Sequence, residues 1–132
     1  MHKLDKGSLS EAKILAALMV AGYQVSIPWS QNSRYDLVAD KDETLYRIQC
    51  KTAWLTKDKT RLKFHTCSCN ATITQKSYQG QIELFAVYSP DLDKVYLMSV
   101  DDVGATGCAL RLKPTQNNQA KRVRYATDYE LG

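Results

Sequence analysis

The sequence predicts a single α/β (α+β) domain in which one helix precedes a mixed and mostly antiparallel sheet. Apolar residues near the start recur at the spacing of a helix face, and short apolar runs separated by turn residues fill much of the remaining chain. The turns between successive runs are short, which favours antiparallel pairing. A length of 132 residues, of which 44% are apolar, fits one domain with one core.

The helix is expected over residues 8–21, where apolar positions lie three or four residues apart. These positions are Leu9, Ala12, Leu15, Ala16 and Met19. Gly22 is expected to end the helix, because glycine is common just past a helix end. At the start, Ser8-Leu9-Ser10-Glu11 has the pattern of a capping box, in which the side chain of Glu11 caps the first turn.

The strands are expected at apolar runs bounded by turn residues. They cover residues 23–28, 35–39, 44–54, 62–66, 82–88 and 94–100. Residues 40–43 form a turn that makes the flanking strands antiparallel, and residues 54–69 form an inserted hairpin with a basic tip. We expect residues 70–81 to be irregular, residues 101–107 to hold a helical turn, and residues 126–131 to be weakly helical.

The strand over residues 44–54 has one apolar and one polar face, since side chains alternate along a strand. The apolar face holds Tyr46, Ile48 and Cys50, and the polar face holds Arg47, Gln49 and Lys51. A lysine in a central strand needs a counter-ion, and Asp36 on the neighbouring strand is the obvious candidate. Asp36 and Lys51 therefore form either a structural ion pair or part of a catalytic site.

A carboxylate beside a lysine is what a metal-dependent phosphodiester hydrolase requires. The carboxylate holds Mg²⁺, which prefers oxygen ligands. The lysine orients the attacking water or stabilises developing negative charge. Glu11 is a third candidate for such a site, but on the sequence alone its role as a helix cap is favoured.

Several segments resemble the PD-(D/E)xK endonucleases associated with group I introns, over residues 7–131. The main ones are Ser33-Arg34-Tyr35-Asp36-Leu37-Val38 and Arg47-Ile48-Gln49-Cys50-Lys51-Thr52. Others are Gly7-Ser8-Leu9-Ser10-Glu11-Ala12, Gly22-Tyr23 with Val25 and Pro28, Leu84-Phe85-Ala86-Val87-Tyr88, Val95-Tyr96-Leu97 and Asp128-Tyr129-Glu130-Leu131. The implied fold is a PD-(D/E)xK restriction-endonuclease-like core, with a mostly antiparallel central sheet flanked by helices, as in archaeal Holliday-junction resolvases.

The resemblance implies a role for each matching residue. Asp36 matches the metal-binding aspartate, Lys51 the catalytic lysine, and Glu11 the acidic residue that these enzymes often carry on the first helix. Gln49 occupies the position of the second acidic residue, and the backbone carbonyl of Cys50 is implied as a further metal ligand. The implied cofactor is Mg²⁺, for which Mn²⁺ substitutes.

The sequence departs from the family pattern at two positions. Tyr35 replaces the proline of the family's name, which has no chemical role. Gln49 replaces an aspartate or glutamate, so its amide oxygen can bind a metal ion but brings no charge. The second departure makes a carboxylate from Glu11 more necessary, and it leaves open a weak or inactive site.

The basic residues are concentrated in two segments of a chain whose net charge is +4. These are residues 57–63 and 111–124, and the rest of the chain is acidic on balance. Such a distribution suits a polyanion, and a two-stranded ribbon fits the major groove of double-stranded DNA. A polar loop without a partner is the alternative for the second segment. The predicted DNA-binding residues are Gln31, Arg34, Lys57, Lys59, Arg61, Lys63, His65, Gln116, Asn117, Lys121, Arg122 and Arg124.

Other classes of protein and site find little support in the sequence. No apolar run suits a membrane span or a signal peptide, so a cytoplasmic protein, bacterial or organellar, without a membrane partner is expected. The four cysteines are then expected to stay reduced. His65-Thr66-Cys67-Ser68-Cys69 lacks the two paired arms of a zinc site, and no glycine-rich loop indicates a nucleotide cofactor.

The function predicted from the resemblance is that of a homing endonuclease. Such an enzyme hydrolyses both strands of DNA with Mg²⁺ at a long pseudo-palindromic site in an intronless allele. One active centre per chain then requires a homodimer or a dimer of dimers. A Holliday-junction resolvase or a restriction-type nuclease is the nearest alternative. A catalytically inactive DNA-binding protein on the same fold and a small interaction domain are alternatives from other classes.

Overall fold

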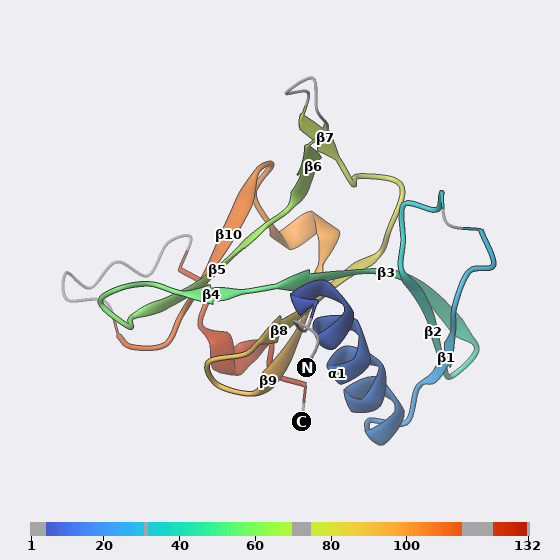
Figure 1. The fold of residues 1–132 in the computed structure, drawn as a ribbon, viewed down its shortest axis with the longest axis horizontal. Helices are drawn as coiled ribbons and strands as arrows, with labels where there is room; N and C mark the ends of the chain where they lie inside the picture. Colours follow the sequence, from blue (N-terminus) through green and yellow to red (C-terminus); the bar gives the residue numbers. More distant parts are fainter. Residues whose placement is uncertain (1–4, 31, 70–74, 115–122, 132) are drawn as a thin grey trace.

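The computed structural model describes residues 5–30, 32–69, 75–114 and 123–131. A helix, a five-stranded sheet and a three-stranded sheet lie one upon another (Figure 1). The elements in chain order are α1 (Lys6–Val20), β1 (Gln24–Ser26), β2 (Leu37–Lys41), β3 (Thr44–Thr52), β4 (Trp54–Leu55), β5 (Arg61–His65), β6 (Cys67–Cys69), β7 (Gln75–Ser77), β8 (Leu84–Ser89), β9 (Lys94–Ser99), η1 (Val100–Asp102), β10 (Gly107–Arg111) and η2 (Ala126–Asp128).

Helix α1 confirms the predicted helix but begins two residues earlier, at Lys6. Asp5 is its N-cap, and the Asp5 carboxylate accepts a hydrogen bond of 3.0 Å from the Gly7 N–H. The predicted capping box is therefore wrong, because Ser8 lies inside the first turn and donates its hydroxyl to Asp5. This cap leaves the side chain of Glu11 available for another role. Gly22 follows the helix with a φ of 97°, which glycine adopts without strain.

The five-stranded sheet has the order β1-β2-β3-β8-β9. Its pairs are antiparallel, as predicted, except for β3 and β8, which are parallel. The turn between β2 and β3 has positive φ at both Asp42 and Glu43, the backbone of a tight hairpin turn. This turn fixes the register of β2 on β3, and that register brings the residue before β2 beside the middle of β3.

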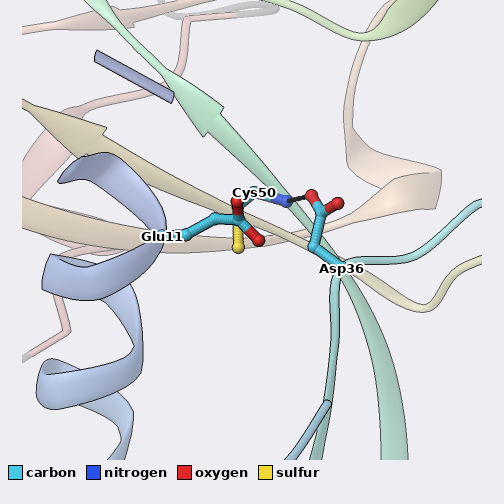
Figure 2. A group of neighbouring side chains, drawn as sticks. All are labelled: Glu11, Asp36 and Cys50. Atoms are coloured by element: carbon cyan, nitrogen blue, oxygen red, sulfur yellow. Dashed lines mark hydrogen bonds between the residues drawn. The ribbon is translucent and has the colours of Figure 1, made fainter. Parts of the chain in front are cut away.

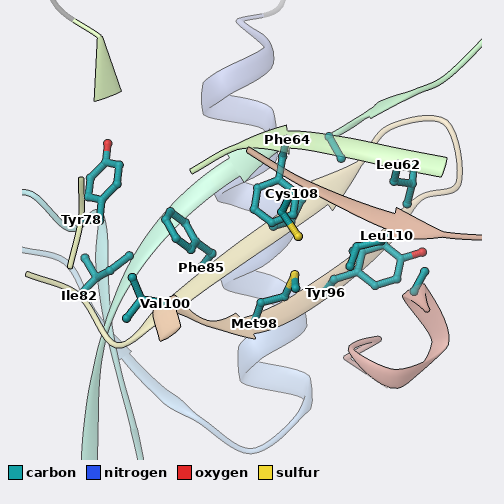
Figure 3. Packing of buried hydrophobic residues seen from close by; sticks show 13 residues of the cluster. Leu62, Phe64, Tyr78, Ile82, Phe85, Tyr96, Met98, Val100, Cys108 and Leu110 are labelled. Carbon is teal, nitrogen blue, oxygen red and sulfur yellow. The ribbon is translucent and has the colours of Figure 1, made fainter. Parts of the chain in front are cut away.

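Each face of this sheet covers a separate apolar core. On one face α1 packs against β3 and β8, with Ile14, Leu18, Ile48 and Ala86 buried between them. On the other face Phe64, Phe85, Tyr96 and Leu110 belong to the second core (Figure 3). A three-stranded sheet covers this second face. Among the described residues α1 is the one α-helix, and it flanks the predicted central sheet on one face.

The three-stranded sheet has the order β10-β5-β4. The predicted hairpin is confirmed for β4 and β5, but β6 pairs with β7 in a second hairpin. Residues 75–77 are thus a strand, and the prediction of an irregular 70–81 is wrong there. Strand β10 was not predicted, although Cys108 and Leu110 alternate with exposed or half-buried neighbours in the strand pattern.

The remaining predicted turns have short helical counterparts. The helical turn expected within residues 101–107 lies at η1, one residue earlier, and the weakly helical tail contains η2. No helix in the described part of the chain combines the length and the apolar character that crossing a membrane requires.

Candidate active site

Asp36 directly precedes β2 and is held by two hydrogen bonds to β3. Its N–H donates to the carbonyl of Ile48 at 2.8 Å, and its Oδ2 accepts from the N–H of Cys50 at 2.9 Å. The backbone bond continues the pairing of β2 with β3, so the position of the carboxylate follows from the sheet register. Asp36 is half-buried at this point.

Glu11 approaches the same place from α1. The preceding residue, Ser10, is buried, and its hydroxyl shares a hydrogen bond of 2.5 Å with the hydroxyl of Thr52 at the end of β3. This bond ties the first turns of the helix to the strand that carries Cys50. Glu11 is therefore placed by the helix register and not by a capping interaction.

The two carboxylates converge on the side chain of Cys50, as Figure 2 shows. A carboxylate oxygen of Glu11, one of Asp36 and the Sγ of Cys50 all lie within 4.8 Å of one another. In the described part of the chain this is the one group of three or more acidic, cysteine or histidine side chains in which such atoms gather so closely. Three segments distant in sequence meet here: α1, the start of β2 and the middle of β3.

Electrostatic effects disfavour negative charge in this group. Burial raises the pKa of Glu11, and the neighbouring charge of Asp36 raises it further. Burial also raises the pKa of Asp36, while the hydrogen bond from Cys50 and the charge of Lys51 act in the opposite direction. Burial raises the pKa of the Cys50 thiol, and both carboxylates add to this shift, so the thiol stays protonated at neutral pH.

This donor set fits a hard divalent cation. Two carboxylates lie together, yet neither forms an ion pair within 4.0 Å with a lysine, arginine or histidine of the described residues. A cation between them would stabilise the charged forms that burial disfavours in both carboxylates, and that the charge of Asp36 disfavours further in Glu11. Two carboxylates supply the oxygen ligands that Mg²⁺ prefers.

Gln49 and Lys51 lie on the face of β3 opposite Cys50, as the strand alternation predicts. The side-chain amide of Gln49 is 3.5 Å from the carbonyl oxygen of Cys50, the oxygen implied as a metal ligand. Lys51 and Asp36 do not form an ion pair among the described residues, so the structural ion pair suggested by the sequence is absent there. Its ammonium instead lies over the ring of Tyr78, 5.1 Å from the centroid.

Arg34 is held beside the same ring. Its guanidinium carbon lies 3.9 Å from the centroid of Tyr78, and one of its terminal nitrogens donates to the carbonyl of Ser77 at 3.0 Å. Its Nε donates to the side chain of Gln81. These contacts fix a positive charge two residues before Asp36, at the side of the site where β7 ends.

A basic groove lies on the outer face of the three-stranded sheet. Leu62 and Phe64 of β5 point into the core, so Arg61, Lys63 and His65 point outward. The groove has a volume of about 550 Å³, and none of the described residues that line it is acidic. The lining residues are Trp54, Arg61, Lys63, Phe64, His65, Cys67, Thr106, Gly107, Cys108 and Ala109.

The centre of this groove combines charge with an aromatic surface. Trp54 is 44% exposed, and its ring centroid lies 5.0 Å from that of His65. The sheet register places Trp54, Lys63 and Ala109 in one row across the three strands. The sequence had suggested the basic residues of β5, but the contribution of β10 and the tryptophan platform depend on pairing that local patterns do not reveal.

The other predicted DNA-binding residues fall into two groups. Lys57 and Lys59 are exposed at the tip between β4 and β5, where Asp58 accepts hydrogen bonds from Thr56 and Thr60. Arg124 is half-buried, and its carbonyl accepts a hydrogen bond of 2.7 Å from the N–H of Arg111. Gln31, Gln116, Asn117, Lys121 and Arg122 lie outside the described residues.

Comparison with known proteins identifies a family and similar solved structures. A family model described as PD-(D/E)XK endonuclease matches residues 1–132. The structure of a bacterial homing endonuclease, I-Ssp6803I, is similar with a TM-score of 0.71 and 21% identity, covering 95% of this chain and 86% of that one. MepB is similar with a TM-score of 0.41 and 15% identity, covering 84% of this chain and 85% of that one. No curated protein matches.

Proposed function

Because this chain belongs to the PD-(D/E)XK endonuclease family, we propose that it is a homing endonuclease that cuts double-stranded DNA at one long, pseudo-palindromic site. Membership in the family makes the protein a metal-dependent endonuclease. The proposal adds the metal, Mg²⁺, and the biological substrate, an allele that lacks a group I intron. The fold shared with a bacterial homing endonuclease is consistent with it.

One observation carries the catalytic part of the proposal. The carboxylates of Glu11 and Asp36 lie within 4.8 Å of each other beside Cys50 of β3, the strand whose opposite face carries Gln49 and Lys51. Burial raises the pKa of both carboxylates, and the charge of Asp36 raises that of Glu11 further, so two negative charges here have a cost. A cation-dependent reaction at this point gives the arrangement a function.

Asp36 and Glu11 would hold the magnesium ion as charged ligands. The side-chain oxygen of Gln49 and the backbone carbonyl of Cys50 would complete the protein's share as neutral ligands. When bound, the ion would offset charge on the scissile phosphate and act as a Lewis acid. Burial and both carboxylates raise the pKa of the Cys50 thiol, so in the metal-free protein the proton stays on sulfur.

Lys51 supplies the positive charge of the protein itself. Its ammonium is not neutralised by an ion pair among the described residues, so its three N–H donors are free to contact a phosphate oxygen or the attacking water. Hydrogen bonds of this kind stabilise the charge that develops on phosphate oxygens during attack. Arg34 adds a second fixed positive charge near the same point.

The outer face of the three-stranded sheet is the proposed DNA-reading surface. Arg61, Lys63 and His65 would face the duplex, with the exposed tip at Lys57 and Lys59 beside them. The Nε of Arg61 is buried and has no hydrogen-bond partner among the described residues. A sheet surface of this kind can enter the major groove, where base edges are distinguishable.

Cleavage of both strands requires more than one copy of the chain. A domain of this size holds one candidate centre among its described residues, so a homodimer or a dimer of dimers would present two centres related by symmetry. The two-fold relation would impose a pseudo-palindromic target.

Gln49 favours a second candidate function. A neutral amide at the position of the second acidic residue weakens the attraction for a metal ion, so a DNA-binding protein with little or no cleavage is the alternative.

The deciding experiment incubates the purified protein with Mg²⁺ and DNA carrying the uninterrupted target gene. We expect one double-strand break with the unaltered protein and none with Asp36→Ala or Lys51→Ala. Asp91→Ala and Lys41→Ala are matched controls, because both residues are exposed and lie outside the site. Specific binding without cleavage by the unaltered protein would establish the alternative, and preferential cutting of a four-way junction would indicate a resolvase.

A further inference from the structure

The side chain of Lys51 needs a contact that restricts its position, because Asp36, its expected partner, does not form an ion pair with it. The Asp36 carboxylate accepts a hydrogen bond from the Cys50 N–H, and it forms no ion pair with Lys51. A lysine side chain has many rotamers, and an ammonium that acts at one phosphate must be confined to few of them. The aromatic ring of Tyr78 is the contact that the structure offers for this purpose.

Tyr78 follows β7 and is only 5% exposed. Its ring is fixed by an edge-to-face contact with Phe85, with centroids 5.6 Å apart and an interplanar angle of 88°. Phe85 lies on β8, directly beside Gln49 of β3. The ring therefore takes its position from the central sheet, although Tyr78 itself lies in a connecting segment (Figure 3).

Two cations lie over this ring. The Lys51 ammonium is 5.1 Å and the Arg34 guanidinium carbon 3.9 Å from the centroid. The electron-rich face of an aromatic ring attracts cations, so the Tyr78 ring stabilises both positive charges at these positions. Arg34 is also anchored at Ser77 and Gln81, on either side of Tyr78. One side chain thus links the segment that precedes Asp36 to the strand that carries Lys51.

We propose that Tyr78 is a positioning residue, whose ring holds Lys51 and Arg34 together as a two-cation clamp aimed at the scissile phosphate. The inference rests on the proposed function for the role of the clamp, and on the contacts above for its existence. The ring face, and not the hydroxyl, makes the contact. Tyr78→Phe therefore keeps the clamp, whereas Tyr78→Leu and Tyr78→Met remove it while leaving an apolar side chain in the core.

The first measurement does not depend on cleavage. In protein labelled with ¹³C-lysine, the ε-methylene resonance of Lys51, assigned by its loss in Lys51→Ala, is expected to be displaced by the ring current of Tyr78. The displacement persists in Tyr78→Phe and disappears in Tyr78→Leu or Tyr78→Met. If the unaltered protein shows no displacement, or if removal of the ring does not change it, the proposal is wrong.

The second measurement separates positioning from binding. We expect Tyr78→Leu to lower kcat by about 100-fold, the cost of misplacing a reacting group by roughly an ångström, with little change in KM. Tyr78→Phe should keep kcat close to that of the unaltered protein. A fall in kcat that is equal in Tyr78→Phe would assign the effect to the hydroxyl and overturn the proposal.

Tyr88→Leu is the matched control for loss of a buried tyrosine. Tyr88 is also 5% exposed and has a lysine, Lys13, 5.9 Å from its ring centroid, but this pair lies outside the proposed site. The variant should lose stability yet keep both the Lys51 resonance and kcat. If neither the unaltered protein nor any variant cleaves DNA, the proposed function is wrong. The chemical shift of the Lys51 ε-methylene then decides by itself whether Tyr78 holds Lys51.

Discussion

The hydroxyls of Ser10 and Thr52 lie 2.5 Å apart and join the first helix to the end of β3. Ser10 is buried, so its partner cannot be replaced by bulk water without a rearrangement. The bond lies one residue from Glu11 and one residue from Lys51. It therefore fixes the distance between the two elements that the candidate site needs.

We expect Ser10→Ala to lower the free energy of unfolding by about 1–2 kcal/mol, because it leaves the Thr52 hydroxyl without its partner. Urea unfolding measures the change, with Lys6→Ala as a control at an exposed position of the same helix. The double variant Ser10→Ala with Thr52→Val should lose less than the sum of the single changes. Strictly additive losses would mean that the two hydroxyls do not interact.

The new assignment of the helix cap separates two acidic residues. Asp5→Ala should cost about 1 kcal/mol of stability and leave cleavage intact, because Asp5 caps α1. Glu11→Gln should abolish most cleavage and, without metal, raise stability slightly, because the charged form of Glu11 is disfavoured by burial and by Asp36. Thermal unfolding in a chelator and a cleavage assay test both. If Glu11→Gln lowered stability and left cleavage intact while Asp5→Ala had no effect on stability, Glu11 and not Asp5 would be the residue that caps the helix.

Gln49→Glu restores the acidic residue of the family pattern. A third carboxylate should reduce the Mg²⁺ concentration needed for half-maximal cleavage by about tenfold, since each added charge strengthens the attraction for the ion. Titration of cleavage rate against Mg²⁺ measures this, and Gln24→Glu serves as a control at an exposed glutamine of β1, outside the site. An unchanged titration would show that residue 49 does not face the ion.

Lys63 lies in the middle of the basic groove. Lys63→Ala should weaken DNA binding and reduce the slope of log affinity against log salt by about one, the effect of losing one phosphate contact. Lys41→Ala, at the end of β2 in the five-stranded sheet, should leave the slope unchanged. Fluorescence anisotropy over a salt series makes the comparison, and equal slopes for both variants would remove the groove from the interface.

We expect the ion pair of Arg47 and Glu83 to contribute to the free energy of unfolding in a way that is lost at acid pH. The hydrogen bond from the Arg47 side chain lowers the pKa of Glu83 below its ordinary value of 4.5. A lowered pKa means that the contribution is complete above the unfolded pKa and is lost as the pH falls through the folded one. Urea unfolding of the unaltered protein and Glu83→Gln should therefore differ at pH 6 and converge at low pH. A difference that grows on acidification contradicts this assignment.

The sequence predicted the elements that carry their own local signals. The alternation along β3 is visible in Ile48 and Lys51, and the turn that pairs β2 with β3 is marked by Asp42 and Glu43. The start of α1 was misjudged because Asp5 and Ser8 are both good caps, and the choice between them depends on where the helix packs. Local preference could not decide this.

The contacts that complete the site are non-local and had no such signal. Strand β10 follows a turn and pairs with β5, which lies more than forty residues earlier in the chain. Tyr78 lay in a segment judged irregular, and its relation to Lys51 depends on the packing of Phe85. A polar, tyrosine-bearing run gives no hint of the ring's location until the sheet has formed.

The short connection between β3 and β4 has a consequence for where DNA is cut. Figure 1 shows β3 continuing into β4, with only Ala53 between the two strands. Ala53 is buried, and its N–H donates to the carbonyl of Tyr88 at 2.9 Å, so the connection is anchored to the central sheet. Lys51 and Trp54 are thus separated by about 10 Å of extended backbone. This span corresponds to roughly three base-pair steps of duplex DNA. If Trp54 contacts bases and Lys51 acts at the scissile phosphate, the rigid connection would keep a constant number of base pairs between the contacted bases and the cleaved bond.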